Sequence, residues 1–153
     1  MHFNTFEEIL DFAIEREKQA ADFYQELARK EVFPRSRQTL LEFAAEEKKH
    51  QDLLEAFKKG NPSAATYAYE WIPDMKRSDY MDTVSYAPGM DLVEILRLAM
   101  KREESALRLY TFLASQTTDP ACIRLFKLLA QEEARHKQTF ETLYDETMAG
   151  LGD

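Results

Sequence analysis

Cysteine is almost absent from this sequence of 153 residues, which contains only Cys122. One cysteine permits neither an internal disulfide nor a four-cysteine metal site, so any metal must be bound through oxygen and nitrogen. Glycine and proline are also scarce, with four and five residues. With 44% hydrophobic and 31% charged residues, this composition indicates an all-α protein rather than a sheet or a disordered chain.

Positive charge is in deficit, because the net charge is -8. The sequence lacks the basic footprint that phosphate recognition needs, so we expect no nucleic-acid partner and regard cations as the more natural ligands. No run of about 18 apolar residues occurs, and the first residues carry acids where a signal peptide is basic. We therefore expect a cytoplasmic protein with no membrane segment, built as a single domain over residues 1–153.

Apolar residues recur at helical spacing in four stretches. They cover residues of about 5–31, 35–59, 91–116 and 120–148. The turn between the first and second helices is short, and so is the turn between the third and fourth. Each short turn predicts that the two helices it joins pack antiparallel. The long connection, residues 60–90, can span a helix length and let the second and third helices run parallel. This is the topology of a ferritin-like four-helix bundle with one crossover.

Residues at both ends of these stretches are typical of helix boundaries. Thr5 with Glu8 can form a capping box, and Asp91 with Glu94 can cap the third helix. Asp119 before a proline is a strong helix start. Pro34 predicts the first break, while Gly60 and Gly150 predict helix ends.

The sequence matches itself at an offset of 86 residues, which separates Glu17 from Glu103 and His50 from His136. The matching residues include the pairs Arg16 and Arg102, Ala20 and Ala106, Tyr24 and Tyr110, Glu46 and Glu132, and Glu47 and Glu133. A duplicated helical hairpin predicts an internal pseudo-twofold axis between the halves.

The second and fourth predicted helices each contain one Glu-x-x-His, which lies among large hydrophobic residues at helical spacing. The first and third predicted helices each contain one Glu in a similar row of apolar residues. These candidate metal ligands are Glu17, Glu47, His50, Glu103, Glu133 and His136. Buried carboxylates without counter-charge would cost several kcal/mol each and repel one another. A Glu from two helices and Glu-x-x-His from the other two is the ligand pattern of di-iron and di-manganese bundles. We therefore expect two Fe ions per bundle, with Mn or Zn as alternatives.

Other interpretations of these residues stay open. The motifs can be coincidences on charged helix surfaces, and Glu46 and Glu132 are alternative ligands because they also recur. Tyr24 and Tyr110 can hydrogen-bond metal-binding carboxylates, or simply pack in the bundle.

Four segments, EKQAADFY, EEKKH, EESALRLY and EEARH, resemble the rubrerythrin-like branch of the ferritin-like superfamily. By this resemblance the terminal carboxylates are Glu17 and Glu103, the bridging carboxylates Glu47 and Glu133, and the nitrogen ligands His50 and His136. Two features depart from the family pattern. Classical rubrerythrins carry a four-cysteine rubredoxin domain, which is missing here, and a further Glu where this sequence has Ala106. The ligand set is thus closer to that of bacterioferritin.

The resemblance implies a non-haem di-iron protein that oxidises bound Fe(II) with H2O2 or O2, as a peroxidase or a ferroxidase. The alternative is a non-enzymatic bundle that stores iron or holds a structural metal. The implied partners are H2O2 or O2, a separate electron donor such as a rubredoxin-type protein, and a second copy of the chain in a homodimer.

Overall fold

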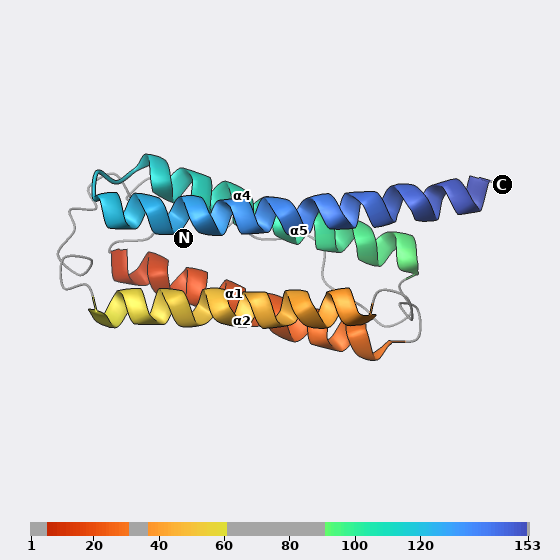
Figure 1. Ribbon diagram of the computed structural model, residues 1–153, viewed down its shortest axis with the longest axis horizontal. Coiled ribbons are helices and arrows are strands. Elements are labelled where there is room, and N and C mark those ends of the chain that lie inside the picture. The colour runs from red at the N-terminus through yellow and green to blue at the C-terminus, as the bar shows by residue number, and fades with distance from the viewer. Residues whose placement is uncertain (1–5, 31–36, 61–90, 153) are drawn as a thin grey trace. The chain divides into compact units, whose positions relative to one another are not determined.

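The computed structural model describes residues 6–30, 37–60 and 91–152, which form four helices and contain no strand. Helix α1 spans Phe6–Arg29, α2 spans Arg37–Gly60, α4 spans Leu92–Ser115 and α5 spans Pro120–Gly152 (Figure 1). The predicted all-α class is confirmed.

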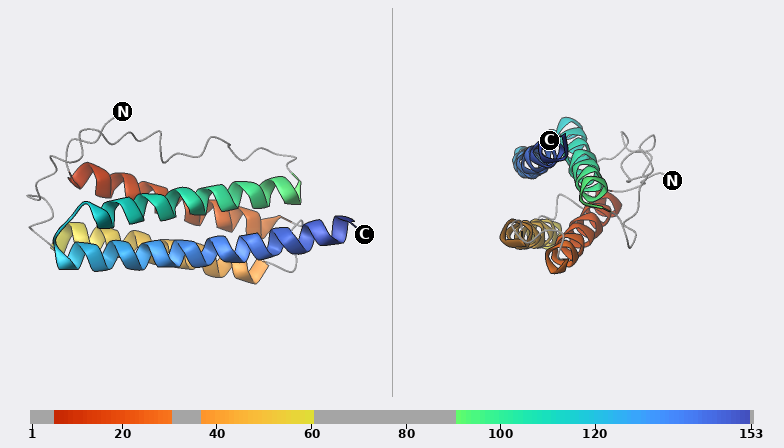
Figure 2. Two further views of the ribbon diagram at one scale, coloured as in Figure 1. Left: turned by 90° about the horizontal axis from the view of Figure 1, so that it is seen from above. Right: turned by 90° about the vertical axis from the view of Figure 1, so that its right-hand side faces the viewer.

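The chain divides into two compact units, residues 1–79 and 80–153. In the first unit α1 packs antiparallel against α2, and in the second unit α4 packs antiparallel against α5 (Figures 1 and 2). The two predicted antiparallel pairs are therefore confirmed. The single domain, the parallel second and third helices and the pseudo-twofold axis stay predictions, and the predicted crossover lies outside the described residues.

The helix ends follow from local hydrogen bonds. The Asp91 side chain accepts from the Glu94 N–H at 2.8 Å, and the Glu94 side chain accepts from the Asp91 N–H at 3.4 Å, which completes a capping box. Asp119 accepts from the N–H of Ala121 at 3.1 Å, at the start of α5. Both predicted caps are confirmed, whereas the boundary signals at residues 5 and 34 lie outside the described residues.

Helix α5 is longer than the sequence indicates, because it passes through Gly150 and ends at Gly152 instead of residue 148. Glycine ends a helix when its backbone takes the left-handed conformation, and Gly150 does not adopt it. A glycine with helical backbone costs only about 1 kcal/mol relative to alanine, which the helix tolerates.

The predicted apolar seams are buried in both units, with four exceptions. Buried members include Leu10, Ala13, Tyr24, Leu27, Leu40, Phe43, Leu54, Leu96, Ala99, Tyr110, Leu113, Phe126, Leu129 and Phe140. The exceptions are two pairs of equivalent residues, Ala20 with Ala106 and Phe57 with Leu143, which are half-buried. Phe57 and Leu143 lie near the open end of each hairpin, where the facing helix begins. Among the described helices, none is long and apolar enough to cross a membrane.

Candidate metal centre

A cluster of three residues lies between α1 and α2. This cluster, here called the first triad, consists of Glu17, Glu47 and His50. They are only 2%, 1% and 5% exposed. The Nδ1 atom of His50 lies 3.5 Å from Oε2 of Glu17 and 3.8 Å from Oε1 of Glu47. One potential ligand atom from each residue lies within 4.8 Å of the other two, so the first triad can hold a metal ion.

An equivalent cluster lies between α4 and α5. This cluster, here called the second triad, consists of Glu103, Glu133 and His136. All three are at most 1% exposed. The Nδ1 atom of His136 lies 3.5 Å from Oε1 of Glu103, the same separation as in the first triad. Again one potential ligand atom from each residue lies within 4.8 Å of the others. The duplication seen in the sequence therefore corresponds to two sites of similar geometry.

The register of each hairpin brings its triad together. A spacing of three residues puts the Glu and the His of Glu-x-x-His on one helix face. Aromatic contacts then align the facing helix: the rings of Tyr24 and Phe43 are 6.1 Å apart in the first unit, and those of Tyr110 and Phe126 are stacked 6.4 Å apart in the second. Because these rings are buried, a shift in register would lose packing as well as the triad.

The donor set suits a divalent cation. Each triad offers two carboxylates and one imidazole, ligand types that bind iron, manganese and zinc. Two carboxylates carry the charge that one divalent cation neutralises, and neutralisation lowers the cost of burying them. In both triads Nδ1 is the ring nitrogen that faces a carboxylate, so it is positioned to share a ligand sphere with that carboxylate.

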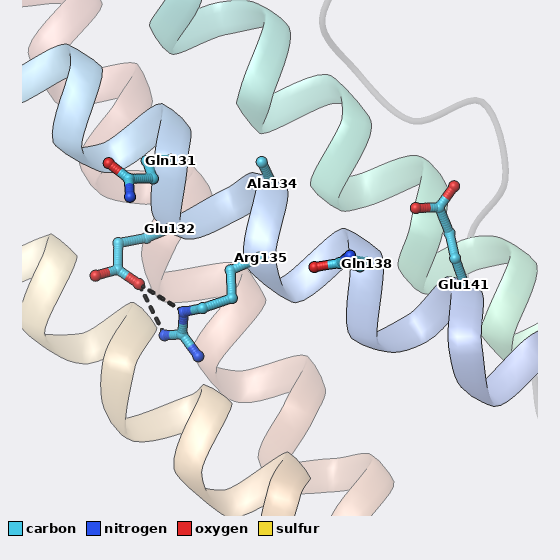
Figure 3. Close-up of a pocket in the computed structure, with 6 residues that line it drawn as sticks. All are labelled: Gln131, Glu132, Ala134, Arg135, Gln138 and Glu141. Carbon is cyan, nitrogen blue, oxygen red and sulfur yellow. Dashed lines mark hydrogen bonds and ion pairs between the residues drawn. The ribbon is translucent and has the colours of Figure 1, made fainter.

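The alternative ligands, Glu46 and Glu132, lie away from these groups of ligand atoms. Both are half-buried, whereas Glu47 and Glu133 are each 1% exposed. The Glu132 carboxylate accepts from Nε and Nη2 of Arg135 at 3.2 and 2.7 Å, beside a surface depression on α5 (Figure 3). The geometry therefore favours Glu47 and Glu133 as ligands, as the apolar spacing predicts, although metal binding itself stays a prediction.

Tyr24 and Tyr110 are fully buried in ring contacts, so the packing role is observed. Their predicted hydrogen bonds to metal-binding carboxylates stay predictions. Arg16 and Arg102 are half-buried.

Sequence reasoning missed an ion pair beside the second triad. Nζ of Lys137 lies 2.8 Å from Oε2 of Glu104, and this contact joins α5 to α4. The hydrogen bond to Glu104 raises the pKa of Lys137 above its ordinary value of 10.5. The available signal was position: these residues directly follow Glu103 and His136, which the hairpin register places side by side.

The surroundings of Cys122 make its thiol unreactive. The thiol is fully buried and donates to Oδ2 of Asp119 at 3.2 Å. Burial, and then the hydrogen bond to Asp119, raises the pKa of Cys122 to about 12. The thiol therefore stays protonated near neutral pH and is a poor nucleophile or metal ligand.

Comparisons with known proteins agree with this architecture. The model of the family described as "Ferritin-like domain" matches residues 6–146. A solved structure of a hypothetical protein from Pyrococcus furiosus is similar, with a TM-score of 0.70 and 28% identity over 92% of this chain and 89% of that one. No curated protein is significantly similar. The predicted ferritin-like fold is thereby confirmed.

Proposed function

Because this chain belongs to the ferritin-like domain family, we propose that it is a rubrerythrin-like di-iron protein that oxidises bound Fe(II) with H2O2 or O2. One observation carries the proposal: a buried triad of two carboxylates and one imidazole occurs in each helical pair. Two triads supply ligands for two metal ions, and the ligand pattern is that of di-iron carboxylate bundles.

The protein's contribution is binding, charge balance and exclusion of water. When bound, two Fe(II) ions would each release one electron, and H2O2 would take both with two protons to form two waters, or O2 would take them to form H2O2. The two carboxylates of each triad would favour the higher charge of an oxidised ion. Buried hydrophobic residues next to each triad, such as Phe43 and Leu129, keep the ligands out of bulk water.

Iron is the metal that we propose, with manganese and zinc as competitors for the same donors. Mixed carboxylate and imidazole ligands suit iron in both oxidation states, but zinc also binds such donors. We propose that the electrons for repeated turnover come from a donor outside residues 1–153, such as a rubredoxin-type protein, because the single cysteine of these residues cannot build a four-cysteine centre. We also propose a homodimer, which sedimentation velocity would test.

The test is rapid mixing of anaerobic Fe(II)-loaded protein with H2O2 or with O2, followed by the near-ultraviolet absorbance of ferric iron. Glu47→Ala removes a proposed ligand, and Glu46→Ala is its matched control on the preceding residue. A fast reaction with H2O2 and a slow one with O2 supports a peroxidase, and a fast reaction with O2 supports a ferroxidase. In both cases Glu47→Ala, but not Glu46→Ala, must abolish the signal.

Two results would contradict the proposal. Iron that binds stoichiometrically but reacts with neither oxidant would favour the storage or structural alternative. Failure of the wild-type protein to bind Fe(II), measured by equilibrium dialysis, would remove the di-iron function altogether.

A further inference from the structure

The ion pair between Glu104 and Lys137 occupies a special place in the second unit. Glu104 directly follows the triad residue Glu103 on α4, and Lys137 directly follows the triad residue His136 on α5. The pair, 2.8 Å apart, therefore bridges the two helices at the level where Glu103 and His136 approach to 3.5 Å. The side chain of Glu104 is 39% exposed and that of Lys137 is 30% exposed, so the pair flanks the triad on the solvent side.

The first unit has the same triad but different residues at these two positions. The equivalents, 86 residues earlier, are Lys18 and Gln51. Gln51 donates to Oε1 of Glu55 at 3.3 Å, which is a bond within α2. A lysine and a glutamine cannot form an ion pair, so this cross-helix link belongs to the second unit.

We propose that Glu104 and Lys137 are a positioning pair that makes the second triad bind divalent metal more tightly than the first. The inference rests on the proposed metal binding. A ligand set held in its binding geometry loses less conformational freedom when the metal arrives, and its affinity rises accordingly. A partly exposed ion pair contributes modestly, so the expected gain is about two- to fivefold in Kd.

The test measures Co(II) affinity by its visible absorbance, with each triad isolated in the full chain. His50→Ala leaves only the second triad complete, and His136→Ala leaves only the first. The double variant Glu104→Gln with Lys137→Gln is then introduced into both backgrounds. It removes the ion pair without changing the net charge. We expect Kd to rise about two- to fivefold in the His50→Ala background and to stay constant in the His136→Ala background.

Rescue separates positioning from simple loss of contacts. The charge-reversed pair Glu104→Lys with Lys137→Glu is made together with Glu141→Gln, because Glu141 lies 3.9 Å from Lys137 and would repel a glutamate there. This variant restores the cross-helix ion pair and should restore the original Kd. Installing the pair in the first unit, as Lys18→Glu with Gln51→Lys in the His136→Ala background, should tighten binding there. Urea unfolding of each metal-free variant checks that the fold persists.

The outcomes distinguish the two proposals. An unchanged Kd after removal of the pair, or an equal change in both backgrounds, overturns the positioning role and leaves the di-iron function intact. If a His variant does not fold or does not bind Co(II), the pair is removed from the wild-type protein instead. Removal of the pair must then raise the Kd of one of the two Co(II) binding steps. Absence of Co(II) and Fe(II) binding by the wild-type protein overturns both.

Discussion

The two helical pairs of this protein share their interior and differ on their surface. Both bury two carboxylates and one imidazole, and in both the His Nδ1 lies 3.5 Å from the Glu of the facing helix. At the open end of each hairpin, equivalent positions carry different chemistry: Lys58 pairs with Asp11, whereas Arg97 donates to the Tyr144 hydroxyl at 3.1 Å. Each contact spans 47 residues of sequence. The register of a hairpin can thus be supported by different polar pairs, but the triad requires particular donors.

The largest expected effect on stability comes from truncating two equivalent core residues. Phe126 in the second unit is 0% exposed, and Leu40 in the first unit is 1% exposed. Phe126→Ala should lower the free energy of unfolding by about 3–5 kcal/mol and Leu40→Ala by about 2–5 kcal/mol, through lost burial and a residual cavity. Urea unfolding measures both. Leu41→Ala is the control, since Leu41 is 43% exposed and should change stability by about 0.5 kcal/mol or less. Equal losses at positions 40 and 41 would contradict the burial.

Metal binding should stabilise both triads, and removal of one ligand should reverse that. Co(II) at about 100 times the Kd of a triad adds about 2.7 kcal/mol to the free energy of unfolding for each triad that it occupies. Glu133→Met should abolish the contribution of the second triad, and Glu47→Met that of the first. Without metal, the loss should be smaller than the loss of the metal response, because removal of one of the two buried carboxylates of a triad also removes its desolvation cost and its repulsion of the other carboxylate. Thermal unfolding with and without Co(II) measures both effects, and Glu132→Met must keep the metal response.

The contacts at the open ends should differ in their response to salt and pH. The hydrogen bond to Asp11 raises the pKa of Lys58 above 10.5. The stabilisation is therefore complete below pH 10.5 and is lost as the pH rises through the folded-state pKa. Lys58→Met should cost about 0.2–1 kcal/mol at low salt and less in 1 M NaCl. Tyr144→Phe should cost a similar amount with weaker salt dependence, and equal salt dependence would contradict the distinction.

The smallest expected effect on stability at neutral pH concerns Cys122, which has no thiol counterpart in the first unit. Its pKa rises from 9.0 to about 12 on folding, so its contribution to stability is present below pH 9 and declines between pH 9 and 12. At pH 8 iodoacetamide should label the native thiol much more slowly than the urea-unfolded one. Rapid labelling of the native protein, measured by mass spectrometry, would show that the thiol is accessible.

Much of the local structure was predictable because it depends on neighbours in sequence. The capping box of Asp91 and Glu94 needs residues only three apart, and apolar spacing identified the buried face on which Glu47 and Glu133 lie. The end of α5 was not predictable from Gly150, since a glycine permits both helical and left-handed backbone. The ion pair of Glu104 and Lys137 was missed because it depends on the alignment of two helices.

By itself, the sequence determined the helical class, the duplication, the helix faces and the kinds of ligand available, because these follow from composition and from spacing along one chain. Only the tertiary structure decided which atoms meet. The packing of α1 on α2 and of α4 on α5 sets the helix register, and register determines that His50 reaches Glu17 and that His136 reaches Glu103. Contacts between side chains on separate helices depend on the packing of the whole pair, which no local pattern specifies.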